Sequence, residues 1–286
     1  MARQHLYADP EIYDILHADG TASDVARFAR VARRVSAGLR GVKQLRWLEP
    51  ASGSGRYLLA CAKRGDVAVG IDFSKEMVAY TLARAEAAGL SGVGGVVGRM
   101  ETFDLGKVEW AGKQGAGKNG AGKPTAFGKA HVVFNPINSI RHVATDSAML
   151  KHLDRVRACL HADGVYIVGL SLSAYGLETV SEDVWVGKRG KTTVTQVVQY
   201  EPPDEDARGA AGRRERVMSH LTIERGGVEE HRDSSYWLRT YNLQQWLGLV
   251  EKAKWRVAGT FDNTGKIAKG SEPGYYLFVL VPTRGK

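Results

Sequence analysis

The chain has 286 residues, of which 43% are hydrophobic, so it suits one large globular domain, or a domain with an insertion, and not a disordered or fibrous protein. Its formal charge of +9 fits either an anionic partner such as nucleic acid or a basic solvated surface. Two cysteines exclude a disulfide framework, and the absence of a long apolar stretch argues against a signal region or membrane span, which favours a cytoplasmic protein.

Two helices are predicted near the start of the chain. In the first, Ile12, Tyr13 and Leu16 share one face at helical spacing. The second is expected over residues 23–39, with Ser23 as its N-cap. The tyrosine is either a packing residue or a residue that covers a ligand.

A glycine-rich turn follows the first predicted strand. The apolar run 45–48 is long enough for a buried strand, and Glu49 closes it. Gly53 and Gly55 then allow a tight turn and a close approach of the backbone to a ligand. A helix over residues 57–62 would point its N-terminal amides at the turn.

The next predicted strand, residues 67–71, ends at Asp72, whose carboxylate can accept hydrogen bonds from two ribose hydroxyls. This pattern predicts a nucleoside site at the carboxyl ends of parallel strands. Leu58 stands where a dinucleotide fingerprint has its third glycine, and Glu49 would repel a pyrophosphate. Both features favour a ligand with a cationic amine and no phosphate, such as S-adenosylmethionine.

At this motif the sequence resembles the class I S-adenosylmethionine-dependent methyltransferases, in which an acidic residue precedes Gly-x-Gly-x-Gly. The run here is Glu49-Pro-Ala51-Ser-Gly53-Ser-Gly55, with Ala51 in place of the first glycine. The Tyr13-Asp14 pair followed by Leu-His is similar to the opening of small-molecule N-methyltransferases, including those that act on amino sugars. The resemblance implies that S-adenosylmethionine is the cofactor. The residues that it implies for cofactor binding are Tyr13, Glu49, Ala51, Gly53, Gly55, Asp72, Phe73, Met77, Met100, Glu101 and Asn135.

The middle of the chain continues the alternation of helix and strand. Ser74 is the candidate N-cap of a helix over residues 75–88, and residues 93–97 are a third strand. Residues 111–129 repeat Gly and Lys without a hydrophobic face, which predicts a flexible loop. The loop lacks the ending and the preceding strand of a phosphate-binding loop.

A polar stretch, residues 135–142, follows a fourth strand predicted over residues 131–134. Its position at the end of a central strand, on a bend held by Pro136, predicts a site. His142 is the candidate general base and, with Tyr13, the candidate catalytic residue. The alternative is that Arg141 and His142 form a structural pair that bonds loop carbonyls.

The rest of the chain changes character after residue 172. A helix over residues 150–160 and a fifth strand over residues 165–170, with a turn at residues 163–164, complete the alternating part. Short antiparallel strands are then predicted at residues 184–186, 193–200, 216–224 and 228–238, the last two joined by a hairpin at residues 226–227. A helix over residues 243–253, capped by Asn242, and strands at residues 255–262 and 275–281 end the chain.

Together these elements predict an α/β fold: a doubly wound, mostly parallel, seven-stranded Rossmann-like methyltransferase sheet with an antiparallel β insertion after strand five. The predicted units are cofactor-covering helices in residues 1–44, a core of residues 45–172 and 240–286, a substrate lid of residues 173–239, and the flexible loop 111–129. The insertion is also a candidate dimer surface.

The resulting functional hypothesis is methyl transfer to a nitrogen or oxygen of a small metabolite. Mixed charges on the insertion argue against a groove for phosphates. Two alternatives stay open: a methyltransferase of nucleic-acid bases, to which Asn135-Pro136 and the basic charge point, and a cofactor-binding protein without catalysis. No residues have metal-ligand spacing. The candidate substrate-binding residues are Asn138, Arg141, Tyr175, Tyr236 and Arg239.

Overall fold

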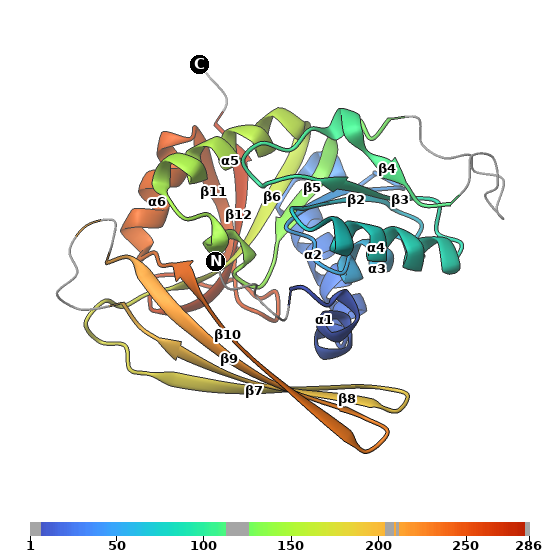
Figure 1. Ribbon diagram of the computed structural model, residues 1–286. Coiled ribbons are helices and arrows are strands. Elements are labelled where there is room, and N and C mark those ends of the chain that lie inside the picture. Colours follow the sequence, from blue (N-terminus) through green and yellow to red (C-terminus); the bar gives the residue numbers. More distant parts are fainter. Residues whose placement is uncertain (1–6, 113–125, 204–208, 210–211, 284–286) are drawn as a thin grey trace.

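The computed structural model describes residues 7–112, 126–203, 209 and 212–283, and its main feature is a mixed sheet in the order β11-β12-β6-β5-β1-β2-β3-β4 (Figure 1). Strands β6, β5, β1, β2 and β3 are parallel to one another, whereas β12 pairs antiparallel with β6 and β11, and β4 pairs antiparallel with β3. The bounds are β1 Arg46–Pro50, β2 Val67–Asp72, β3 Val93–Val97, β4 Glu109–Trp110, β5 Ala130–Asn135, β6 Leu160–Leu172, β11 Trp255–Phe261 and β12 Gly274–Pro282. The sheet has eight strands where the sequence predicts seven, and the additional one is the two-residue β4.

Helices cover both faces of this sheet because neighbouring residues of a strand point to opposite sides. In β1, Trp47 packs with the helices α2 and α3, and Leu48 packs on the other side with α5 and α6. The helices are α1 Pro10–His17, α2 Thr21–Val35, α3 Arg56–Lys63, α4 Lys75–Ala87, α5 Asp146–Cys159 and α6 Leu243–Lys252, with short 3-10 helices η1 Ala37–Leu39, η2 Leu105–Lys107 and η3 Ser139–His142. In the described part of the chain, no helix has the length and apolar character needed to span a membrane.

A second, antiparallel sheet has the order β10-β9-β8-β7 and lies to one side of the main sheet (Figure 1). Its strands are β7 Ser181–Arg189, β8 Thr192–Glu201, β9 Arg214–Arg225 and β10 Val228–Arg239. Gly226 and Gly227 both have positive φ in the turn between β9 and β10, as a tight hairpin requires. The second sheet packs against α1 through Ile12, Leu16 and Leu221, so α1 lies between the two sheets.

The second helix differs from the prediction at both ends. It spans Thr21–Val35, with Gly20 in the left-handed conformation as its N-cap, and the Ser23 hydroxyl lies within the first turn and donates to the Gly20 carbonyl at 2.7 Å. It ends early because Ser36 is extended and donates its hydroxyl to the carbonyl of Asp163, 2.8 Å away. This tertiary contact stops the helix four residues before the predicted end.

Two further boundaries are corrected by the structure. Most of the predicted flexible loop 111–129 lies outside the described residues, at 113–125. At its two ends, however, Ala111 and Phe127 are only 2% and 3% exposed and pack into the core. Leu160, expected to end a helix, instead begins β6, so this strand starts before the turn predicted at residues 163–164. Ala111, Phe127 and Leu160 are buried individually, which the average composition of the surrounding residues did not indicate.

Candidate active site

The glycine-rich turn connects β1 to α3 at the carboxyl edge of the main sheet. Ala51, Gly53 and Gly55 all have φ between 52° and 69°, the left-handed region. Gly55 could not carry a side chain, because a Cβ there would lie 2.3 Å from Cγ2 of Thr81. Ala51 adopts the left-handed backbone geometry as the two glycines do, at a higher conformational cost for a residue with a side chain.

Asp72, the last residue of β2, anchors this turn. Its carboxylate accepts hydrogen bonds from the amide of Gly53 at 2.8 Å and from the amide of Ser74 at 2.9 Å. Burial raises its pKa, and these amides pull the pKa back down. A carboxylate has about four acceptor positions, so it can still accept hydrogen bonds from two hydroxyl groups of a ligand. Asp72 also borders the cavity described below, where such a ligand would lie.

Glu49 presents a buried carboxylate beneath the same turn. It is 4% exposed, and its Oε2 has no hydrogen-bond partner among the described residues. Burial raises its pKa well above the usual range, opposed by the Arg56 guanidinium and supported by the Asp72 carboxylate. An orphan acid close to Asp72 suits a ligand that carries a cationic amine or sulfonium, as S-adenosylmethionine does. The residues present therefore fit the cofactor that the sequence predicts.

Tyr13 places the covering helix α1 directly over the turn. A Cβ on Gly53 would lie 3.2 Å from Cε1 of the Tyr13 ring. Burial raises the pKa of Tyr13 to about 12, against the influence of Arg56, so its hydroxyl stays protonated at neutral pH.

A cavity of about 910 Å³ opens between the turn, α1 and the second sheet. It brings together most of the predicted site residues from distant parts of the chain. Those that border it are Tyr13, Ala51, Gly53, Asp72, Phe73, Met77, Met100, Glu101, Asn138, Arg141, His142 and Tyr236.

Six rings line one part of this cavity; we call them the aromatic cluster (Tyr7, Tyr13, His17, His142, Trp185 and Tyr236). The Tyr7 centroid lies 5.7 Å from those of Tyr13 and His142 and 5.9 Å from that of Tyr236. His142 also stacks on Tyr236, with centroids 5.6 Å apart. His17 lies 4.6 Å from Tyr13 and 6.1 Å from Trp185. Sequence reasoning missed His17 and Trp185 as cavity residues, because no local pattern links them.

Both histidines of the cluster are neutral near pH 7. Burial, together with the neighbouring Arg141, lowers the pKa of His142 to about 4. Burial and Arg56 likewise lower the pKa of His17 to about 4, which Asp14 partly opposes. The His142 side chain is open to the cavity, but the cavity is concave, so protein surrounds the ring and disfavours its charge.

Five predicted site residues are not among the described residues that border the cavity: Glu49 and Gly55 belong to the glycine-rich turn and its base, and Asn135, Tyr175 and Arg239 hydrogen-bond the framework. Asn135 is fully buried; its amide donates to the Pro50 carbonyl and its side-chain oxygen accepts from the hydroxyl of Tyr166 at 2.7 Å. Tyr175 hydrogen-bonds Gln245 at 3.0 Å, and Arg239 pairs with Asp146 at 2.9 Å.

Arg141 combines both roles. The residue borders the cavity, and its guanidinium pairs with Glu215 at 2.7 Å and donates to the backbone carbonyl of Arg239 at 2.9 Å. The structural pairing predicted as an alternative thus holds for Arg141, whereas His142 faces the aromatic cluster.

No protein-family model matches the sequence, and no curated protein does. Solved structures do match. DesVI from Streptomyces venezuelae is 20% identical, with a TM-score of 0.68 over 96% of this chain and 98% of that one. The sugar N-methyltransferase KedS8 from a Streptoalloteichus species is 17% identical, with a TM-score of 0.65 over 96% and 92% of the two chains. CalS10, an amino pentose methyltransferase from Micromonospora echinaspora solved with S-adenosylmethionine bound, is 18% identical, with a TM-score of 0.62 over 93% of this chain and 92% of that one. The chain therefore has the fold of S-adenosylmethionine-dependent small-molecule methyltransferases.

Proposed function

We propose that this protein transfers the methyl group of S-adenosylmethionine to a nitrogen atom of a small metabolite. The fold supports a methyltransferase, and two proteins with similar structures are a sugar N-methyltransferase and an amino pentose methyltransferase. The choice of nitrogen rests on the chemistry of this chain's own cavity.

The cofactor side of the cavity is acidic. Asp72 would accept hydrogen bonds from the ribose, and the orphan carboxylate of Glu49 would offset the positive charge of the methionine end. Tyr13 would lie over that end, because its ring already packs on Gly53. Once bound, the cofactor supplies a methyl group on a cationic sulfur; the chain's part is to place the acceptor and exclude water.

The acceptor side is a hollow lined by rings, and this observation carries the proposal: the Tyr7 ring centroid lies 5.7–5.9 Å from those of Tyr13, His142 and Tyr236, and these rings exclude water from a bound acceptor. The same surroundings that lower the pKa of His17 and His142 to about 4 would lower the pKa of an ammonium bound beside them. An amine would therefore reach the methyl group unprotonated and with its lone pair free. A hydroxyl would need a base, and a histidine with a pKa of about 4 is a weak one near pH 7.

His142 therefore orients the acceptor by accepting a hydrogen bond from its N–H. The Tyr7 hydroxyl lies 3.5 Å from His142 Nε2, so an acceptor group can take over this long contact. Arginines and carboxylates are mixed around the cavity, including Arg27, Arg99, Asp24 and Asp183, which favours a small polar acceptor over a nucleic acid.

The test is methyl transfer by the purified protein to a panel of small amines, their alcohol analogues, RNA and DNA, followed by release of S-adenosylhomocysteine. We expect turnover with an amine, rising with pH as the free ammonium loses its proton. Turnover with alcohols only would contradict the choice of nitrogen. Turnover only with RNA or DNA, falling steeply with salt, would replace the proposal by the nucleic-acid alternative.

A further inference from the structure

Helix α1 touches both sides of the cavity. On one side Tyr13 packs on the glycine-rich turn; on the other, Ile15 and Leu16 pack on the second sheet. The approach to β7 is close, since a Cβ on Gly187 would lie 2.2 Å from the carbonyl oxygen of Ile15. A movement of α1 must therefore displace the glycine-rich turn, β7, or both.

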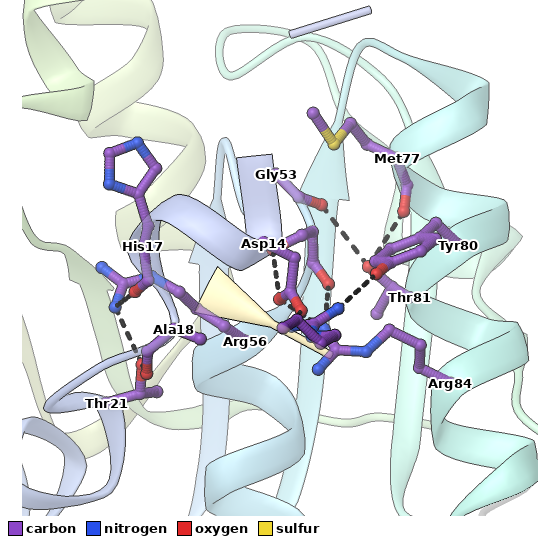
Figure 2. A network of polar contacts seen from close by, with 12 residues as sticks. Asp14, His17, Ala18, Thr21, Gly53, Arg56, Met77, Tyr80, Thr81 and Arg84 are labelled. Carbon is purple, nitrogen blue, oxygen red and sulfur yellow. Dashed lines mark hydrogen bonds and ion pairs between the residues drawn. The ribbon is translucent and has the colours of Figure 1, made fainter. Parts of the chain in front are cut away.

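Asp14 of α1 is a fully buried carboxylate with three partners, Ser54 of the glycine-rich turn, Arg84 of α4 and Arg189 of β7; Figure 2 labels Asp14 and Arg84. Its Oδ1 accepts from the Ser54 hydroxyl at 3.0 Å and from Arg84 Nη1 at 2.5 Å. Its Oδ2 accepts from Nη2 of Arg189. A buried charge is costly unless it is paired and hydrogen-bonded, so this contact set holds α1 in one position.

The partners of Asp14 connect the two sides of the cavity. Ser54 lies in the turn between Gly53 and Gly55, and Arg84 belongs to α4, the helix that carries Met77 to the cofactor side. Arg189 ends β7, the strand that carries Trp185 to the acceptor side, and it also reaches the Tyr80 hydroxyl at 3.4 Å.

A second contact holds the other end of α1. Arg56 directly follows the turn and donates to the carbonyl of His17 at 2.6 Å and to the Thr21 hydroxyl at 2.8 Å (Figure 2). The two residues that flank Gly55 thus both hydrogen-bond α1: Ser54 bonds Asp14, and Arg56 bonds the carbonyl of His17 in its last turn.

We propose that Asp14 is a positioning residue that links the glycine-rich turn to β7, so that cofactor binding at the turn orders the acceptor side of the cavity. The proposal rests on the proposed function. Because coupling between two sites is reciprocal, an acceptor held by β7 and α1 would in turn tighten cofactor binding, by about 5–150-fold if the coupling is of ordinary size.

The test compares wild type, Arg189→Gln and Asp14→Asn, with Lys188→Gln on the exposed neighbour as matched control. Arg189→Gln removes the contacts of this side chain to Asp14 and to the Tyr80 hydroxyl and leaves the other partners of Asp14 in place; the side chain is 41% exposed, so the variant is expected to fold. Amide hydrogen exchange is measured in β7 and α1, without ligand and with saturating S-adenosylhomocysteine, whose Kd is measured by calorimetry.

In wild type and Lys188→Gln, S-adenosylhomocysteine should slow exchange in both α1 and β7. In Arg189→Gln, β7 should exchange on the order of tenfold faster without ligand, and ligand should slow α1 but not β7, with the Kd nearly unchanged. Asp14→Asn should lose the slowing in both elements and weaken binding on the order of tenfold.

Wild-type exchange behaviour of β7 in Arg189→Gln, with and without ligand, would overturn the link. Failure of cofactor binding, on which the proposed function depends, looks different: wild-type protein would then give no heat with S-adenosylhomocysteine. In that case the ligand-free exchange of Arg189→Gln and Asp14→Asn, compared with wild type, would decide whether Asp14 ties β7 to the turn.

Discussion

Glu49 shows how a single residue can trade stability for binding. Its pKa is raised in the folded chain, so between the unfolded and folded pKa values the folded state holds more protons and loses stability as pH rises. A cationic ligand would reverse this, because it favours the ionised carboxylate. An unpartnered buried carboxylate lowers the stability of the framework, whereas in a binding site it can pair with a cationic ligand.

We therefore predict opposite effects of Glu49→Gln on the two properties. Near neutral pH the variant should melt higher than wild type without ligand, because a buried charge is gone. It should bind S-adenosylmethionine more weakly, by about 1–3 kcal/mol. Wild-type affinity should fall as pH drops through the raised pKa of Glu49, and the variant should show less of this dependence. Calorimetry at several pH values measures the affinity and its pH dependence in both proteins. Equal affinities of wild type and Glu49→Gln at every pH would rule out the assigned role.

Asp72 offers a comparison with a matched control on the same strand region. Asp72→Ala removes the ribose acceptor and the anchor of the Gly53 amide, and should cost about 1–3 kcal/mol of cofactor binding. Asp66, just before β2, is equally buried and accepts from Leu45 N at 2.9 Å and Trp47 Nε1 at 3.0 Å. Asp66→Ala should lower the melting temperature and leave the cofactor Kd unchanged. If both variants bound S-adenosylhomocysteine like wild type, Asp72 would not be the ribose residue.

At the scale of elements, the contact between α1 and β7 depends on a glycine. Gly187 lies opposite the backbone of Ile15 and Leu16, which cannot move aside as a flexible side chain would. Gly187→Ala should push the second sheet away from α1, costing about 1–3 kcal/mol of stability, and should raise the KM for the acceptor more than that for the cofactor.

The control for this substitution is Gly248→Ala, within α6 at a position where a Cβ meets nothing within 4 Å. It should be neutral or slightly stabilising, since alanine favours helix. Thermal unfolding and steady-state kinetics, measured on Gly187→Ala and Gly248→Ala, distinguish a displaced second sheet from a general effect of adding a methyl group. A Gly187→Ala protein with wild-type stability and KM values would show that β7 can shift without affecting the cavity.

For the whole molecule, buried histidines set the response to acid. His152 is fully buried between the Met100 carbonyl and the Tyr166 hydroxyl, and burial lowers its pKa to about 4. The unfolded chain binds the proton near pH 6.5 and the folded chain does not, so this stability is present above pH 6.5 and is lost as pH falls towards 4.

We predict that the wild-type protein loses stability between pH 7 and pH 5, with His152 contributing on the order of 2 kcal/mol. Denaturant unfolding at the two pH values measures this loss. His152→Gln should be less stable than wild type at pH 7 and less sensitive to acid. An identical pH dependence in the two proteins would contradict the assignment.

The amino-acid sequence by itself determined the local features of the cofactor side. Strand, glycine turn and acidic strand end follow within 30 residues, so hydrophobic periodicity and turn chemistry were enough to predict Gly53, Asp72 and the helix capped by Ser74. The alternating residues of the second sheet and the capping of α6 by Asn242 were predicted for the same reason.

Only the tertiary structure decided which polar residues face the cavity and which hydrogen-bond within the framework. The aromatic cluster joins residues 7, 13 and 17 to 142, 185 and 236, and no short-range pattern connects them. Asn135 and Arg239 looked like site residues, but packing turned them towards the Pro50 carbonyl and Asp146. The sequence could name Tyr13, His142 and Tyr236 one by one, but it could not show that they meet Tyr7, His17 and Trp185, because that contact depends on elements far apart in the chain.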